Sequence, residues 1–214
     1  MPTEATPSPA APPSVPGTRE RLIAAMTDAL RRRGFHGVGV ADILQQAGAP
    51  KGVLYHHFPG GKADLAVAAI DRVVDRMIAG LDQLLAQQPD PLQATRLWLQ
   101  SATGRLQASG FESGCPLATI ALETTAADTA LREALARAFE RMRQRLAQAL
   151  AAAGHDAARA ESLAALIVSA YEGGLLQARV AHSTAPLDRV TDALLGLLAA
   201  PISAPPSPPP GAPT

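Results

Sequence analysis

The sequence predicts an all-α protein of about nine helices. Apolar residues recur every three to four positions over most of the chain, which is the spacing of one helix face. No segment alternates polar and apolar residues as a half-buried strand does. The interior prolines fall between the periodic stretches, where a missing N–H group does least harm. Together these observations favour helices joined by short loops.

Thirteen of the 19 prolines lie in the first 17 or the last 14 residues. This composition cannot build a hydrophobic core, so we expect disordered tails over residues 1–17 and 201–214. Proline-rich docking ligands are the alternative, but neither tail carries the basic residues that usually orient one. The ordered chain is therefore expected between them, as a domain over residues 18–64 and another over residues 65–200.

The first three predicted helices are short, and each ends at glycine or proline. The first places Leu22, Met26 and Leu30 on one face, and Gly34 can end it in a left-handed cap. Gly48 and a Pro-Gly-Gly run end the next two. The predicted ranges are Thr18–Arg33, Val40–Ala47 and Lys51–Phe58.

Six longer or more apolar helices are expected to follow. The first of them is long, with Leu65, Val73 and Leu81 on one face. Near the chain end, Gly173 and Gly174 each cost a helix about 1 kcal/mol relative to alanine, which predicts close approach of a neighbouring helix. The predicted ranges are Lys62–Gln87, Leu92–Ala108, Pro116 to about Thr125, Thr129–Ala153, Ala157 to about Ala181, and Leu187–Leu198.

The charge distribution separates a basic N-terminal part from an acidic remainder. Residues 18–62 hold seven Lys and Arg against three Asp and Glu, although the whole chain is neutral. The second and third predicted helices, joined by a turn at Gly48, have the spacing of a helix-turn-helix, whose second helix can enter the major groove of DNA. A basic helix-turn-helix predicts DNA binding.

The third helix carries the most specific motif in the chain. It offers a cation at Lys51, bare backbone at Gly52 and a Tyr55-His56-His57 cluster, which suit phosphate and base-edge contacts. Together with Gly34-Phe35 and Ala47-Gly48, the run from Lys51 to Lys62 resembles the DNA-binding domain of TetR-family transcriptional regulators. The resemblance implies a three-helix DNA-binding domain joined to an all-helical domain for ligand binding and dimerisation.

The family pattern assigns a set of residues to the DNA face. Gly39 stands where the family usually has Ser or Thr capping the second helix, and Val53 also replaces a frequent hydroxyl, so neither side chain can bond a phosphate. Lys62 begins a helix, where the helix dipole favours anions. The assigned residues are Gly39, Pro50, Lys51, Gly52, Tyr55, His56 and Lys62.

The segment Gly114-Cys115-Pro116 resembles the LmrA/YxaF-like subgroup of the family, in which a similar segment opens the sixth helix. Pro116 suits a first helical position, which places Cys115 at the cap, where the helix dipole can stabilise a thiolate. A buried, inert cysteine is the alternative. We therefore consider both an effector contact and a thiol sensor that acts through Cys115.

The helical domain is expected to hold a small-molecule effector. The only tryptophan can stack on a planar ligand or pack in the core, and the other polar groups on these helices can face a cavity. Mostly apolar surroundings favour a hydrophobic or aromatic effector. The predicted effector residues are Trp98, Cys115, Thr119, Glu123, Tyr171 and Gln177.

The resemblance and the geometry of DNA both imply a homodimer. The last two helices form the dimer interface in the family, and paired recognition helices one turn apart in the groove read a palindrome. Release of an operator by a ligand requires two sites and two states of the fourth helix, which links the domains. The expected protein is a ligand-responsive regulator, most simply a repressor.

Other classes of protein fit the sequence less well. We find no nucleophile elbow, phosphate loop, metalloprotease motif, cofactor motif or metal-ligand cluster, which argues against an enzyme and a metal sensor. A structural DNA-binding protein would not need the large apolar C-terminal half. One cysteine, no secretory signal and no apolar run long enough to span a membrane predict a cytoplasmic location.

Overall fold

The computed structural model describes residues 16–88 and 90–199, which form nine α-helices and no strand. The all-α prediction is confirmed. The prediction of disordered tails falls on residues outside this range, apart from Pro16 and Gly17, which precede the first helix. The helices are α1 (Thr18–Arg33), α2 (Val40–Ala47), α3 (Lys51–His57), α4 (Lys62–Gln87), α5 (Pro91–Ala108), α6 (Pro116–Glu123), α7 (Thr129–Ala152), α8 (Ala157–Ala181) and α9 (Ala185–Ala199).

The observed helix ends differ from the predicted ones at a few positions, for local reasons. Helix α3 stops at His57 because Phe58 adopts φ −139° and ψ 84°, and the residue before a proline avoids the helical region. Helix α9 begins at Ala185, two residues before the prediction, and thus takes Pro186 into its first turn. Proline therefore marks both boundaries, once as a stop and once as a start.

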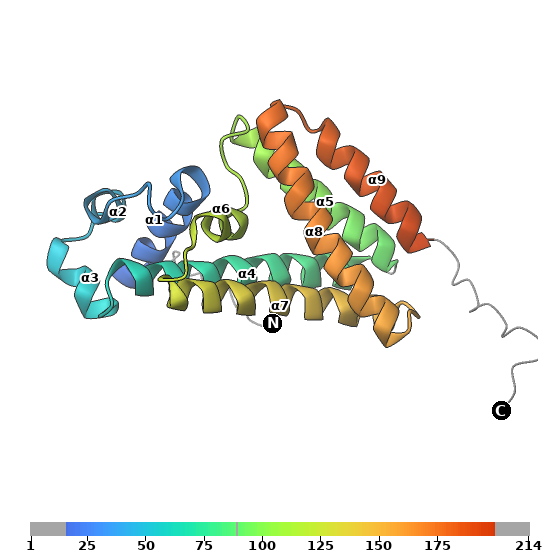
Figure 1. Cartoon of the computed structure of the whole chain (residues 1–214), viewed down its shortest axis with the longest axis horizontal. Coiled ribbons are helices and arrows are strands. Elements are labelled where there is room, and N and C mark those ends of the chain that lie inside the picture. Colours follow the sequence, from blue (N-terminus) through green and yellow to red (C-terminus); the bar gives the residue numbers. More distant parts are fainter. Residues whose placement is uncertain (1–15, 89, 200–214) are drawn as a thin grey trace, which may run out of the picture.

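Helices α1, α2 and α3 form a small group at one end of the molecule (Figure 1). Gly48 ends α2 in the left-handed conformation, with φ 58° and ψ 41°. The left-handed cap predicted for α1 is wrong, because Gly34 combines φ 73° with an extended ψ of −173°. The Arg21 Nε group of α1 donates to the Ala47 carbonyl 2.9 Å away, which fixes the end of α2 against α1. Leu22, Met26 and Leu54 are almost fully buried between the helices. This packing sets the orientation of α3.

The long helix α4 connects this end of the molecule to the remaining helices, with α7 lying along it (Figure 1). Arg141 of α7 pairs with Asp75 of α4 at 2.6 Å, and farther along the same two helices Arg145 pairs with Asp82. Helix α6 contacts α1, α4 and α7. Both α4 and α6 thus touch the α1–α3 group and the rest of the protein.

Helices α5, α8 and α9 lie together at the opposite end (Figure 1). A Cβ atom at Gly174 of α8 would lie 2.9 Å from Leu187 Cδ1 of α9, so the predicted close approach is confirmed there. At Gly173 a Cβ atom would meet nothing within 4 Å. Packing against α9 therefore explains the glycine at position 174. No contact among the described residues explains the glycine at position 173.

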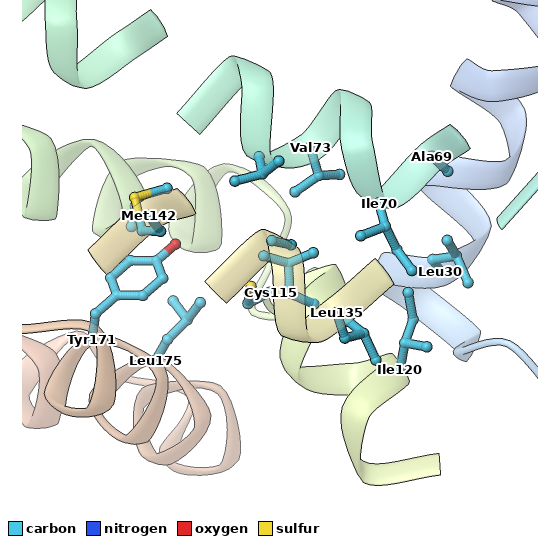
Figure 2. Packing of buried hydrophobic residues seen from close by; sticks show 14 of the residues in the cluster. Leu30, Ala69, Ile70, Val73, Cys115, Ile120, Leu135, Met142, Tyr171 and Leu175 are labelled. Carbon is cyan, nitrogen blue, oxygen red and sulfur yellow. The ribbon is translucent and has the colours of Figure 1, made fainter. Parts of the chain in front are cut away.

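One hydrophobic core runs through all of these helices. Leu30 of α1, Ile70 of α4, Ile120 of α6 and Leu135 of α7 pack together where the two ends of the molecule meet (Figure 2). The core continues from there toward Tyr171 of α8. Within the described residues, no helix is both long and apolar enough to cross a membrane.

Candidate functional site

Helix α3 presents a row of exposed side chains that nothing in the described residues covers. Pro50 precedes the helix as its N-cap, and Lys51, Gly52 and His56 are all exposed. Tyr55 keeps 57% of its surface accessible, which is unusual for so large a hydrophobic residue. All five residues are exposed, and the four that belong to α3 lie within two helical turns.

The glycines around α3 leave room for this arrangement. Gly61 has φ +67°, and a Cβ atom there would lie 3.2 Å from the Tyr55 ring, so a larger residue would push the tyrosine aside. A Cβ atom at Gly52 would meet nothing within 4 Å. Gly39 is the N-cap of α2 and supplies no capping side chain. Backbone can therefore approach a partner closely at Gly39 and Gly52.

Lys62 starts α4, as predicted, but its ammonium group is already engaged. The Nζ atom lies 4.4 Å from the centre of the Phe35 ring, in a cation–π contact. Burial lowers the pKa of Lys62, and the nearby Glu123 carboxylate opposes this shift. A phosphate contact by Lys62 would require the side chain to turn away from Phe35.

Glu123 does not face a cavity, contrary to the sequence-based prediction. Its Oε2 atom accepts hydrogen bonds from the backbone N–H groups of Phe35 at 2.7 Å and His36 at 2.9 Å. A Cβ atom at Gly34, which has φ +73°, would lie within 2 Å of the same carboxylate. The last residue of α6 therefore holds the turn that follows α1. Sequence spacing could not reveal this contact, which joins residues 88 positions apart.

A cavity of about 820 Å³ opens between α1, α4, α5, α8 and the loop before α6. Its volume lies within the roughly 300–1,000 Å³ typical of small-molecule sites. Three predicted effector residues line it: Trp98, Cys115 and Tyr171. These residues come from α5, the start of α6 and α8, and they lie at one cavity as predicted.

Trp98 and Tyr171 form an aromatic wall of this cavity. Their ring centres lie 5.2 Å apart with the planes inclined by 34°. The indole N–H of Trp98 donates to the Met77 carbonyl at 3.2 Å, which fixes the ring. Burial raises the pKa of Tyr171, so its hydroxyl stays protonated over the physiological range. A flat apolar molecule can pack against this wall.

Thr119 and Gln177 were predicted to face the cavity and do not line it. The Thr119 hydroxyl donates to the Cys115 carbonyl one turn earlier in α6, at 2.9 Å. Gln177 is exposed on α8, and its amide donates to the Gly173 carbonyl. The sequence pattern does not fix the rotation of a helix about its axis. In the structure, the rotation of α6 and α8 directs both side chains away from the cavity.

Cys115 is the N-cap of α6, as predicted, but its thiol is not activated. The backbone N–H groups of Leu117 and Ala118 favour the thiolate, while burial and the adjacent Glu172 carboxyl outweigh them and raise the pKa of Cys115 well above its usual range. The thiol donates to Glu172 Oε1 at 3.1 Å. The start of α6 therefore does not stabilise a thiolate on balance, because burial and Glu172 have the larger effect on the pKa of Cys115.

Six charged residues at the cavity were not predicted from the sequence: Asp28, Arg31, Arg32, Arg76 and Arg105 line it, and Glu172 lies beside its lining residue Cys115. Glu172 is nearly buried, one of its oxygens has no hydrogen-bond partner in the described structure, and burial raises its pKa to about 7. Arg31, Arg76 and Arg105 line the cavity from α1, α4 and α5. In the sequence, Arg31 counted only toward the positive charge of residues 18–62.

Residues 16–88 and 90–199 contain no cluster with the composition of a metal site. No group of three or more His, Cys, Asp or Glu side chains in this range could hold a metal ion. The candidate site therefore consists of the exposed α3 face and the cavity, joined by α1, α4 and α6.

Comparison with known proteins matches both halves of the chain to regulator families. Residues 22–69 match the family described as bacterial regulatory proteins, tetR family, and residues 91–193 match the C-terminal domain of LmrA/YxaF-like transcriptional regulators. The chain is 34% identical to an HTH-type transcriptional regulator of Mycobacterium tuberculosis, over 86% of this chain and 95% of that protein. All of these matches are to transcriptional regulators rather than enzymes.

Two further proteins extend the similarity over nearly the whole described fold. The transcriptional regulator LmrA of Bacillus subtilis is 28% identical over 85% of this chain and 96% of its own length. A crystal structure of a TetR regulatory protein from Rhodobacter sphaeroides superimposes with a TM-score of 0.75 and 29% identity, over 84% of this chain and 97% of that one. Similarity therefore extends across both the α3 face and the cavity.

Proposed function

The chain belongs to the TetR family of bacterial transcriptional regulators, and on this premise we propose that it is a homodimeric repressor controlled by a small molecule. Residues 18–64 bind DNA, and residues 65–200 bind the effector and form the dimer. The repressor binds a palindromic operator and leaves it when the effector fills the cavity. The observation that carries the proposal is the pairing of an exposed recognition helix with a cavity that shares helices with it.

DNA binding is assigned to the exposed face of α3. Lys51 and Tyr55 supply a charge and a hydroxyl for phosphates, and His56 lies beside them for a base edge. Gly39, Pro50 and Gly52 let the backbone approach the duplex, and Lys62 contributes once it leaves Phe35. Their exposure supports this role, because a folded protein gains little by leaving Tyr55 uncovered.

Dimerisation is assigned to α8 and α9. Apolar side chains remain exposed on both helices, with Val180 at 78% and Leu197 at 53% accessible. Gly173 and Gly196 each have open space where a Cβ atom would stand, so a partner helix can approach the backbone there. Two helices with exposed apolar side chains and with glycines that admit a neighbouring backbone suit the symmetric interface of a twofold dimer.

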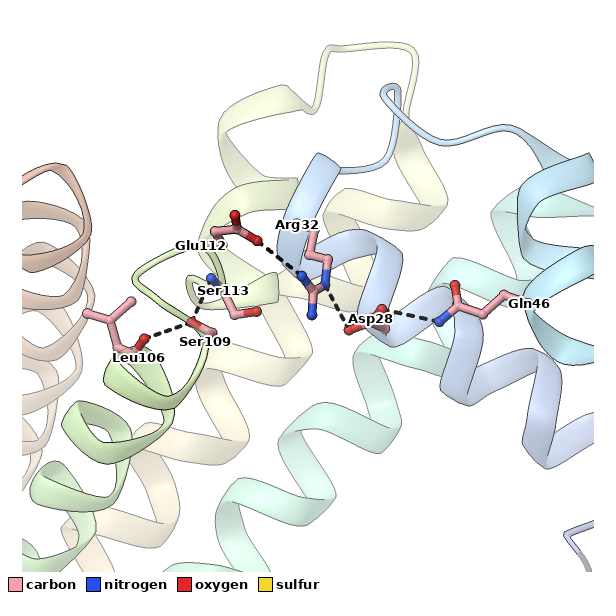
Figure 3. A network of polar contacts seen from close by, with 7 residues as sticks. All are labelled: Asp28, Arg32, Gln46, Leu106, Ser109, Glu112 and Ser113. Atoms are coloured by element: carbon pink, nitrogen blue, oxygen red, sulfur yellow. Dashed lines mark hydrogen bonds and ion pairs between the residues drawn. The ribbon is translucent and has the colours of Figure 1, made fainter. Parts of the chain in front are cut away.

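The effector is assigned to the cavity, with an aromatic or apolar body packed against Trp98 and Tyr171. Helix α6 starts at the cavity with Cys115 and ends at the turn held by Glu123. A second link joins Arg32 of α1 to Glu112 at 3.2 Å, next to the cavity loop (Figure 3). A ligand that moves α4 or α6 therefore moves the recognition helices and changes their spacing.

A thiol sensor that acts through Cys115 is the alternative function. It requires a reactive thiolate, and both burial and the raised pKa of Cys115 oppose this. We therefore favour Cys115 as a neutral wall of the cavity. If Cys115→Ala abolished the response to an electrophile while keeping DNA binding, the alternative would replace the effector proposal.

The test is a titration of the purified protein against the DNA upstream of its own gene and of the adjacent divergent gene. We expect a dimer to bind one palindrome, with affinity that falls steeply between two salt concentrations because phosphates dominate the contacts. The double variant Lys51→Ala/Tyr55→Ala should weaken binding by about 100-fold.

A matched control removes a charge elsewhere. Arg137→Gln on α7, whose partner Glu133 is 4.0 Å away, should bind DNA like the parent. Equal binding of the parent and the Lys51/Tyr55 variant to the same palindrome would contradict the role of α3. Binding by a monomer with full affinity would contradict the dimer.

A further inference from the structure

The cavity that we assign to the effector carries an excess of positive charge. Four arginines line it, whereas Asp28 is its single acidic lining residue in the described structure. The arginines come from three helices: Arg31 and Arg32 from α1, Arg76 from α4, and Arg105 from α5. The apolar residues around Trp98 therefore make up only part of the cavity surface.

These four arginines, which we call the charged rim, line the same cavity as the aromatic wall of Trp98 and Tyr171.

Most of the positive charge in this rim is not neutralised by the protein. In the run Arg31-Arg32-Arg33, Arg32 pairs with Asp28 at 3.3 Å and with Glu112 (Figure 3), and Arg33 pairs with Asp42 at 3.1 Å. Arg31, by contrast, has no carboxylate within 4.0 Å among the described residues. The same holds for Arg76 and Arg105, so three cations at the cavity lack an anionic partner there.

Two of these cations, Arg31 and Arg76, lie near enough to repel each other. Burial and the positive charges of Arg72 and Arg31 lower the pKa of Arg76, which shows that like charges meet at this edge of the cavity. Repulsion of this kind is relieved when an anion binds between the cations. The guanidinium group is also the side chain best shaped to hold a carboxylate through two parallel hydrogen bonds.

Arg105 connects this charge to the aromatic wall. Its Nη1 group donates to the Ser101 hydroxyl at 2.9 Å, and its positive charge opposes the rise in the pKa of Tyr171 that burial causes. Tyr171 in turn packs on Trp98. A ligand with its flat body on these rings would therefore have its polar end beside Arg105.

We propose that the effector is an organic anion, an aromatic or apolar carboxylic acid whose carboxylate binds among Arg31, Arg76 and Arg105. This inference rests on the proposed function, because it specifies the ligand of the cavity assigned there. Arg31 belongs to α1 and Arg76 to α4, so the carboxylate joins the DNA-binding helices to the body. The charge of the effector, rather than its bulk alone, then sets the position of α1.

The test compares acids with their neutral amides by calorimetric titration of the full-length protein without DNA. The pairs are benzoate and benzamide, cinnamate and cinnamamide, and naphthoate and naphthamide. We expect at least one acid to bind about tenfold or more tightly than its amide, since charge-assisted hydrogen bonds are about twice as strong as neutral ones. Trp98, the single tryptophan, should report the same binding by a change in its fluorescence.

The double variant Arg31→Gln/Arg76→Gln should lose the preference for the acid while binding the amide as before. Arg137→Gln, outside the cavity, should keep the preference, and thermal melts should show that both variants fold. Equal affinities of acid and amide in all three pairs would overturn the proposal. So would a preference that survives in the double variant, or acid binding that leaves Trp98 fluorescence unchanged.

A separate measurement of operator release distinguishes this inference from the proposed function. If an acid binds in an Arg31- and Arg76-dependent way but leaves the DNA bound, the anion site stands and ligand-controlled release fails. If acids and amides release the DNA equally well, release stands and the anion site fails.

Discussion

The exposed face of α3 and the cavity differ in how far their residues are buried. On α3, Lys51, Tyr55 and His56 stand in solvent and depend on little else in the protein. In the cavity, Trp98 and Tyr171 are buried and pack against each other, and Trp98 donates a hydrogen bond to the Met77 carbonyl. The first site consists of consecutive residues, whereas the second is assembled from helices far apart in the sequence.

This difference separates function from stability. Residues that wait in solvent for a partner contribute little to the folded state, because their contacts form only in the complex. Residues that line a buried cavity also hold the helices together, so they serve two purposes. Substitutions in the two sites should therefore have very different effects on the free energy of unfolding, and the following predictions test this from the largest effect to the smallest.

Trp98→Ala should lower the free energy of unfolding by about 3–5 kcal/mol, as large-to-small substitutions in cores do. The ring is 4% exposed, and its loss removes both the packing on Tyr171 and the bond to Met77. Chemical denaturation measures the change. Trp98→Phe is the control and should recover much of the loss. A change below about 1 kcal/mol would show that the cavity wall does not support the fold.

Glu172→Gln should stabilise the protein at pH 8 by about 2–3 kcal/mol and have little effect near pH 4. Burial raises the pKa of Glu172 to about 7 in the folded state, above the ordinary value of 4.5. The folded state then keeps a proton that the unfolded state releases, so stability falls as pH rises from about 4.5 to 7.

Denaturation curves of both proteins across this pH range measure the effect. Glutamine stays neutral and can still accept from the Cys115 thiol, so its curve should lack the decline that the parent owes to Glu172. Parallel curves for the two proteins would contradict the raised pKa. Glu161→Gln, on the exposed side of the same helix, is the matched control.

Glu123→Ala should lower the free energy of unfolding by about 1–2 kcal/mol, because it leaves two backbone N–H groups without their acceptor. Hydrogen exchange at the Phe35 and His36 amides should also become faster. Glu123→Gln keeps an acceptor oxygen and should lie between the parent and the alanine variant. Unchanged exchange at both amides would show that the carboxylate does not hold this turn in solution.

Lys51→Ala and Tyr55→Ala should each change the free energy of unfolding by less than about 0.5 kcal/mol, although they weaken DNA binding. Both side chains are exposed, and substitutions at such surface positions rarely matter to the fold. Thermal denaturation of the variants without DNA measures this. A marked loss of stability would remove the contrast between the two sites, because the α3 face would then also support the fold.

The same contrast explains what the sequence could predict. Helix boundaries depend on local signals, such as Gly48 in its left-handed conformation and Pro116 at a first helical position, and these signals placed most boundaries within a residue or two. The α3 motif was found because its residues are consecutive. Its assignment to DNA stays a prediction until binding is measured.

The cavity was only partly predictable, because its lining depends on helix rotation and on distant partners. Trp98 and Tyr171 were expected there, and their size and burial made them good candidates. Glu123 was misplaced because its partners are backbone N–H groups in the turn after α1, which carry no sequence signal. Arg76 and Arg105 were missed because single arginines on helices usually face solvent.

The contact between Gly34 and Glu123 limits how this regulator can be recombined with its relatives. Chimeric sensors are made by grafting the DNA-binding domain of one regulator onto the ligand-binding domain of another. With this ligand-binding domain, a graft that brings any side chain to position 34 would collide with the Glu123 carboxylate. Compatible donors therefore have glycine there, because the backbone at φ +73° would strain any other residue even if residue 123 were shortened.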